Sequence, residues 1–190
     1  WMDPFTLKTL ELLEPQQSGG MSLATCLDDA VTPMGQRLLR RWLAFPLRSL
    51  EAIEERLRVV DYLVAHPEIC EELRRVLEGV GDLERMAARV GVLRCGPREM
   101  VQVARSLEAA SAVCDLLKSG DASAPWQPWL QGMDLCEDLK DRIHNTLSDN
   151  APALLSKGGV IREGYHPELD DLRSLKEDAK GTMQQMVQDE

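Results

Sequence analysis

Histidines are the residues of this sequence that most readily ligate metals or act as general bases. His66, His144 and His166 are far apart, and none lies in a His-Glu-x-x-His spacing that would place two ligands on one helix. We therefore expect no metal site. An alternative is a helical hydrolase whose histidine site is assembled only in space, because a nucleophile and its base need not be neighbours in sequence.

The cysteines favour packing over chemistry. Their number, five, is odd and they form no Cys-x-x-Cys pair, which argues against a disulfide framework and a zinc knuckle. Four fall in register with leucines and alanines on apolar helical stripes, so we expect them to be small core residues. These four are Cys26, Cys70, Cys114 and Cys136.

Nucleotide-binding and acid–base motifs are also missing from the sequence. No Gly-x-x-x-x-Gly-Lys-Ser/Thr loop occurs, and the glycine pairs at 19–20 and 158–159 are not followed by the required lysine. Neighbouring carboxylates such as those at 28–29 and 71–72 are interpreted as solvated helix surface beside arginines. The sequence therefore predicts neither catalytic nor cofactor-binding residues.

One stretch, residues 33–50, is basic and free of acids. The chain as a whole carries 22 Lys+Arg against 32 Asp+Glu, a net charge of −10, and so acidic a body repels DNA phosphates unless a local face is basic. Arg37, Arg40 and Arg41 could form a weak contact face for the DNA backbone. The favoured interpretation is that they pair with acids of this domain or of another domain.

Composition and helix signals predict the elements that position these residues. Aromatic residues make up only 4% of the 190 residues, while the strong helix formers Leu, Ala, Glu and Arg are abundant, so the fold is predicted to be mostly α, an irregular multi-helix bundle. N-capping residues or first-turn prolines mark the expected helix starts: Ser22, Thr32-Pro33, Ser49, Pro67, Asp82 and Pro97. The helix after Ser49 has one apolar side, formed by Leu50, Ile53, Leu57, Val60 and Val64.

Two short segments are predicted to be strands. Residues 5–12 alternate apolar and polar side chains, and residues 159–165 lie between glycines. Paired antiparallel, they would form a small two-stranded β patch near the N-terminus. Residues 121–128 are expected to form a surface loop with Trp126 and Trp129 fixing its end.

The final segment, 167–190, is predicted to be one long helix of about 36 Å after a helical core of residues 1–166. The sequence ends within this helical pattern without a stop signal, so we expect a piece of a larger protein. No uncharged apolar stretch reaches 18 residues, and no signal pattern begins the chain, so no membrane contact and a cytoplasmic location are expected.

Residues 27–47 carry a family resemblance. They read Leu-Asp-x-x-x-Thr-Pro-Met-Gly-x-Arg-Leu-Leu-Arg-Arg-Trp-Leu-x-x-Pro-Leu, which resembles the opening of the core domain of MutS, the family of ATP-dependent DNA mismatch-recognition proteins. Further blocks of similarity lie at 53–60, 81–89 and 161–170, so the resemblance covers nearly the whole chain. One departure is His166, because the family usually has a helix-capping Asp there, and this predicts a weaker cap.

The resemblance implies a structural role. Residues 167–190 would be the root of a lever helix leading to an absent DNA-gripping clamp, and the chain would couple that clamp to an ATPase domain elsewhere. It implies ATP and Mg as cofactors of the parent family, held outside this chain, and mismatched double-stranded DNA bound through domains absent here. It also implies a homodimer of the parent protein, with MutL as a further candidate partner. The alternative from another class is a free-standing helical protein-interaction module.

Overall fold

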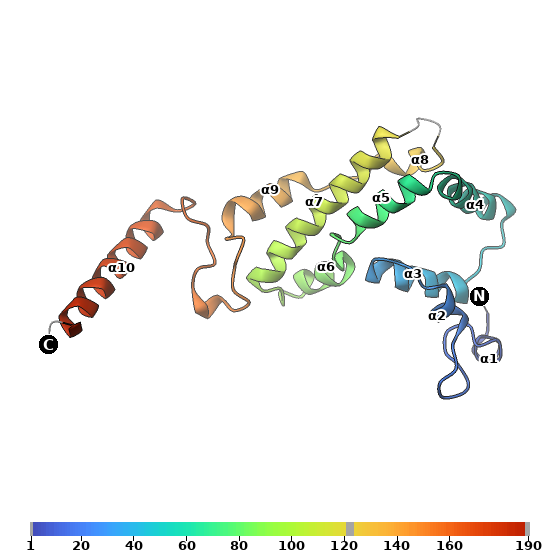
Figure 1. The fold of residues 1–190 in the computed structure, drawn as a ribbon, viewed down its shortest axis with the longest axis horizontal. Helices are drawn as coiled ribbons and strands as arrows, with labels where there is room; N and C mark the ends of the chain where they lie inside the picture. The colour runs from blue at the N-terminus through green and yellow to red at the C-terminus, as the bar shows by residue number, and fades with distance from the viewer. Residues whose placement is uncertain (1, 121–123, 189–190) are drawn as a thin grey trace.

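The computed structural model describes residues 2–120 and 124–188. The prediction of a mostly helical fold is confirmed, because the described residues form ten α-helices and one short 3-10 helix (Figure 1). In chain order these are α1 (Pro4–Thr9), α2 (Leu23–Leu27), α3 (Pro33–Ala44), α4 (Leu50–Ala65), α5 (Pro67–Leu77), α6 (Leu83–Gly91), α7 (Pro97–Ser119), α8 (Gln127–Leu130), α9 (Glu137–Thr146), η1 (Leu155–Lys157) and α10 (Pro167–Gln188).

Side-chain caps explain where several helices begin. The hydroxyls of Thr32 and Ser49 accept hydrogen bonds from the backbone N–H groups three residues later, at 3.1 and 3.5 Å. The carboxylate of Asp82 does the same at the start of α6, at 3.2 Å. Each bond satisfies a donor that the first helical turn leaves unpaired. The predicted starts of α3, α4 and α6 are therefore confirmed.

Helix α7 is the central element of the body, and it packs against α5, α6, α8 and α9 (Figure 1). Two clusters of buried side chains hold these helices together. The cluster towards the end of α7 contains Cys114, Ala124, Trp126 and Leu130, with Val59, Tyr62 and Leu63 of α4 packed against it. The second cluster contains Val103, Ala104 and Ile143.

Of the two tryptophans predicted to fix the end of the 121–128 loop, Trp126 is buried in the first of these clusters, whereas Trp129 is 47% exposed. The Trp126 side chain is 3% exposed, its ring meets Tyr62 edge-on with centroids 4.8 Å apart, and its indole N–H donates to the carbonyl of Leu117 at 3.1 Å. Part of the predicted loop, residues 121–123, lies outside the described residues. Helix α8 begins inside the other part, at Gln127.

The predicted β patch is wrong. Residues 4–9 are the helix α1, because Asp3 caps it by accepting from the N–H of Thr6 at 3.0 Å and Pro4 occupies the first helical position. Ile161 instead forms an isolated antiparallel bridge with Leu147, and no strand occurs within residues 2–120 and 124–188. A capped first turn thus outweighs the short alternating pattern, and the glycine-flanked segment pairs with the chain just after α9.

Helix α10 leaves the body and extends away from it at the opposite end from α4 (Figure 1). The long final helix predicted from Pro167 is therefore present, with the last two residues of the sequence outside the described range. The division into a core of 1–166 and a lever root of 167–190 stays a prediction. None of the helices in the described part of the chain combines the length and the hydropathy of a membrane-spanning segment.

Candidate functional site

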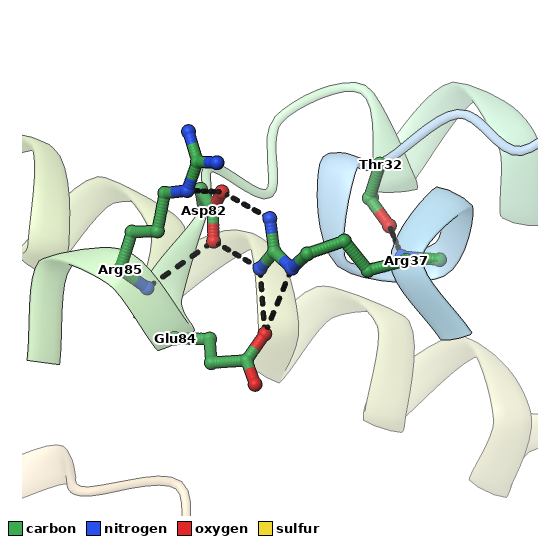
Figure 2. A network of polar contacts seen from close by, with 6 residues as sticks. Thr32, Arg37, Asp82, Glu84 and Arg85 are labelled. Carbon is green, nitrogen blue, oxygen red and sulfur yellow. Dashed lines mark hydrogen bonds and ion pairs between the residues drawn. The ribbon is translucent and has the colours of Figure 1, made fainter. Parts of the chain in front are cut away.

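A cluster of charged side chains joins α3 to α6, and we call it the Arg37 junction; it comprises Arg37, Asp82, Glu84 and Arg85 (Figure 2). Arg37 Nη1 and Nη2 donate to the two carboxylate oxygens of Asp82, each at 2.7 Å. Arg37 Nη2 also donates to Glu84 Oε2 at 2.6 Å, and Nε to the same oxygen at 3.1 Å. A planar guanidinium suits such two-pronged binding of carboxylates.

Local sequence sets the geometry of this junction. The cap on Thr32 fixes the start of α3, so that Arg37 projects from its second turn towards α6 (Figure 2). Asp82 lies at the N-cap of α6, where its carboxylate accepts from the Arg85 N–H as well as from Arg37. The hydrogen bonds from Arg37 lower the pKa of Asp82 to about 2, and those to Asp82 and Glu84 raise the pKa of Arg37. Each of these two pKa shifts favours the ionised form of its group.

The other arginines of the predicted contact face point to different environments. Arg40 Nη2 donates to the backbone carbonyl of Leu13 at 3.0 Å. Arg41 is exposed, and the described residues give it no hydrogen bond or ion pair through its side chain. The structure thus separates the three, and for Arg37 it shows pairing with acids of this domain. A DNA contact by this face stays a prediction.

Two further contacts tie the first 48 residues to the helices that follow. Arg74 of α5 donates to the carboxylate of Asp29 at 2.7 Å and to its carbonyl at 3.1 Å. The guanidinium of Arg56 in α4 stacks over the Trp42 ring, 3.6 Å from its centroid. Both contacts involve exposed or partly exposed groups, and such contacts are individually weak.

The three histidines lie in separate places. His66 stacks on Tyr62, and its Nδ1 lies 2.8 Å from the Tyr62 carbonyl. His144 approaches Glu108 at 4.0 Å, and the His166 carbonyl accepts from the N–H groups of Leu169 and Asp170. No cluster of three or more metal-ligating side chains occurs among the described residues.

The cysteine predictions are confirmed only in part. Cys114 is buried in the core beside α8, whereas Cys26 is exposed, so its predicted core role is wrong. Helix α2 has only five residues, and its buried side chain is Ala24 rather than Cys26. Cys70 and Cys136 are half-buried, and Cys136 sits in the left-handed conformation at the start of α9. Periodicity alone could not tell which side of so short a helix is covered.

Sequence reasoning missed a polar recess of about 640 Å³ between the bridge at Ile161 and the start of α10. Arg162 donates to Asp149 at 2.6 Å on one wall, and Arg173 donates to Asp170 at 2.8 Å beside it. Arg173 also donates to the carbonyl of Ile161 at 2.9 Å, which connects α10 to the bridge. Of these contacts, only the bond from Arg173 to the Ile161 carbonyl joins α10 to the chain before it, because the Arg173–Asp170 pair lies within α10 and the Arg162–Asp149 pair lies outside it.

These contacts join α3 to α6 and connect α10 to the bridge at Ile161. The sequence profile described as MutS domain III matches residues 5–189. The chain belongs to the MutS domain III family. The resemblance predicted from residues 27–47 and the later blocks is therefore confirmed.

Several relatives of this MutS domain share the whole length of the chain. It is 42% identical over 190 residues to the DNA mismatch repair protein MutS of Cytophaga hutchinsonii and 38% identical over 193 residues to that of Christiangramia forsetii. It is 37% identical over 189 residues to that of Bacteroides thetaiotaomicron. Each alignment covers 100% of this chain and 22% of the relative, so the chain spans about a fifth of the length of these MutS proteins.

Proposed function

We propose that this chain is the core and lever root of a MutS-type mismatch-recognition ATPase, and that it couples DNA binding at one end to the nucleotide cycle at the other. Membership of the MutS domain III family supports this role over a free-standing interaction module or a hydrolase. The observation that carries the proposal is the arrangement of α10. It projects from a body centred on α7 (Figure 1). The Arg173 side chain of α10 donates to the carbonyl of Ile161 and so connects the helix to that body.

A packed helix can transmit a displacement because its hydrogen-bonded backbone resists bending. Coupling between two sites of about 1–3 kcal/mol changes an affinity five- to 150-fold, so a modest difference in packing is sufficient. In this proposal no residue of the chain is catalytic. ATP, Mg and the main DNA contacts belong to other parts of the full-length protein, which acts as a homodimer and can engage MutL.

Breaking α10 in the full-length protein tests the coupling. Lys176→Pro removes a helical hydrogen bond and introduces a clash, which costs about 3 kcal/mol or more in a helix interior. Lys176→Ala at the same position keeps the helix and is the matched control. We expect Lys176→Pro to retain basal ATP hydrolysis and to lose the change in hydrolysis rate that mismatched duplex produces, while Lys176→Ala keeps both.

Two results would contradict the proposal. One is a Lys176→Pro protein, folded by circular dichroism, whose ATP turnover still responds to mismatched duplex as the unmodified protein does. The other is ATP hydrolysis or tight duplex binding by the isolated 190-residue chain at physiological ionic strength. An isolated chain with net charge −10 is expected to bind duplex weakly, because phosphates are repelled by its acidic surface.

A further inference from the structure

Helix α4 has a second apolar side outside the core. Its Val59, Tyr62 and Leu63 pack against the cluster around Trp126. The predicted apolar stripe lies on another side of the same helix, and we call it the α4 seam. Its members are Leu50, Ile53, Leu57, Val60 and Val64. Four of them are more than half exposed: Leu50 at 67%, Leu57 at 52%, Val60 at 53% and Val64 at 76%. The stripe that the sequence predicted is thus present, but most of it faces away from the body.

The spacing of residues along the seam indicates which kind of element would pack on it. Its residues alternate in steps of three and four, which is the a/d pattern of a coiled coil. Its ends, Leu50 and Val64, are fourteen positions apart, or roughly 21 Å along the helix axis at about 1.5 Å per residue. A narrow stripe of this kind packs against another helix at a small crossing angle, because ridges of side chains fit into grooves.

The two flanks of the seam differ. On one flank Arg56 stacks on Trp42, and the ring of Trp42 helps to line a recess of about 370 Å³ with Ile53 and Leu57, so this flank is occupied by α3. On the other flank Glu54 and Asp61 are exposed. They directly follow Ile53 and Val60, the two seam residues at d positions of the heptad. A helix on the seam would therefore meet two carboxylates along its open edge, where Lys or Arg side chains fit.

We propose that the α4 seam binds an amphipathic helix with a basic flank, supplied by the part of a full-length MutS polypeptide that lies outside these 190 residues. The chain spans 22% of the relatives' length, so most of such a polypeptide is available to supply the helix. The inference concerns packing and does not depend on the coupling proposed above.

A second copy of the chain fits the seam less well. In an antiparallel pair the flanks that carry Glu54 and Asp61 would face their own copies, and like charges repel. In a parallel pair each of these acidic flanks would face the flank that Trp42 and Arg56 already occupy. Charge and space therefore favour a helix of different sequence.

Site-directed cross-linking in a full-length MutS protein carrying this domain tests the proposal. The photoreactive residue p-benzoylphenylalanine replaces Val60 in the seam and, as the matched control, Arg58, which is exposed on the opposite side of α4. We expect position 60 to give an intramolecular cross-link to a heptad-patterned segment outside these 190 residues. Position 58 is expected not to give this cross-link.

A pair of charge reversals tests the flank. The double variant Glu54→Lys and Asp61→Lys is expected to reduce the yield of the cross-link from position 60. The control is Asp115→Lys with Asp141→Lys, which changes the net charge equally at exposed positions of α7 and α9 and is expected to leave the yield unchanged. A cross-link between two copies, a link within this chain, equal yields at positions 58 and 60, or no effect of the flank reversal would overturn the proposal. ATP turnover is not the readout, so this result is independent of the test of coupling.

Discussion

Arg37 in α3 and Asp82 at the start of α6 form a two-pronged ion pair across 45 residues of sequence, with both N–O distances 2.7 Å. The same Asp82 carboxylate caps α6 by accepting from the N–H of Arg85. One side chain therefore both starts a helix and fixes α3 against it. Because the two roles use different donors, they can be separated by mutation.

Replacing Arg37 tests its contribution to the fold. Arg37→Met removes both ion pairs and leaves the mostly buried Asp82 carboxylate with fewer donors, so the midpoint of thermal unfolding is expected to fall. Arg37→Lys keeps the positive charge but loses the two-pronged geometry of the guanidinium, so its unfolding midpoint is expected to lie between those of the unmodified chain and Arg37→Met. Arg41→Met, at an exposed position, is the control and should leave the midpoint unchanged; equal effects of Arg37→Met and Arg41→Met would show that the junction adds no stability.

Acid unfolding should report the ionisation of Asp82. Hydrogen bonds from Arg37 lower its pKa from 3.8 to about 2 in the folded protein. A carboxyl group with a lowered folded pKa stabilises the fold above its unfolded-state pKa, and this contribution is lost as the pH falls through the folded pKa. The stability advantage of the unmodified chain over Asp82→Asn is therefore expected to shrink between about pH 4 and about pH 2.

The comparison with Asp82→Asn isolates the charge, because asparagine is also a good N-cap. Urea unfolding of both chains, followed by circular dichroism at neutral pH and through this acidic range, gives the difference directly. A difference that does not change with pH would mean that the ionised carboxylate contributes nothing beyond the cap.

Two glycines should respond to alanine in opposite directions. A Cβ at Gly96 would lie 2.8 Å from the backbone carbonyl oxygen of Ala153, so Gly96→Ala is expected to destabilise the chain by about 1–3 kcal/mol. A Cβ at Gly91 would meet nothing within 4 Å, and Gly91→Ala at the end of α6 is expected to stabilise it by about 0.5 kcal/mol. Urea unfolding measures both, and a destabilising Gly91→Ala would contradict the open space around that glycine.

Trp126 should matter more than Trp129. Trp126→Ala removes a buried ring and is expected to cost about 3–5 kcal/mol. Trp126→Phe keeps most of the ring but loses the bond to the Leu117 carbonyl, at an expected cost of about 1–2 kcal/mol. Trp129→Phe, at a half-exposed ring, removes only an exposed bond from the indole N–H to Glu55 Oε1 at 3.2 Å, so it should cost less than about 1 kcal/mol. Denaturant unfolding measures both phenylalanine variants, and a larger loss of unfolding free energy for Trp129→Phe than for Trp126→Phe would contradict the core position of Trp126.

Part of the site could be predicted from sequence, and the rest could not. The acid-free stretch singled out Arg37, Arg40 and Arg41, but nothing in it distinguished the arginine that binds Asp82 and Glu84 from the one that binds the Leu13 carbonyl. The distinction depends on where α6 lies relative to α3, which is a long-range relationship. The recess around Arg162 and Arg173 was missed for the same reason.

The sequence by itself determined the helix starts and the family. Thr32, Ser49 and Asp82 cap their helices through bonds to residues three positions later, so the information is local. The helix at residues 4–9 is capped just as locally, by Asp3, although its alternating pattern predicted a strand. Only the tertiary structure decided that Ile161 pairs with Leu147 and that the α4 seam faces outward. Periodicity shows that a helix has an apolar side, but what covers that side depends on the arrangement of the other helices in space.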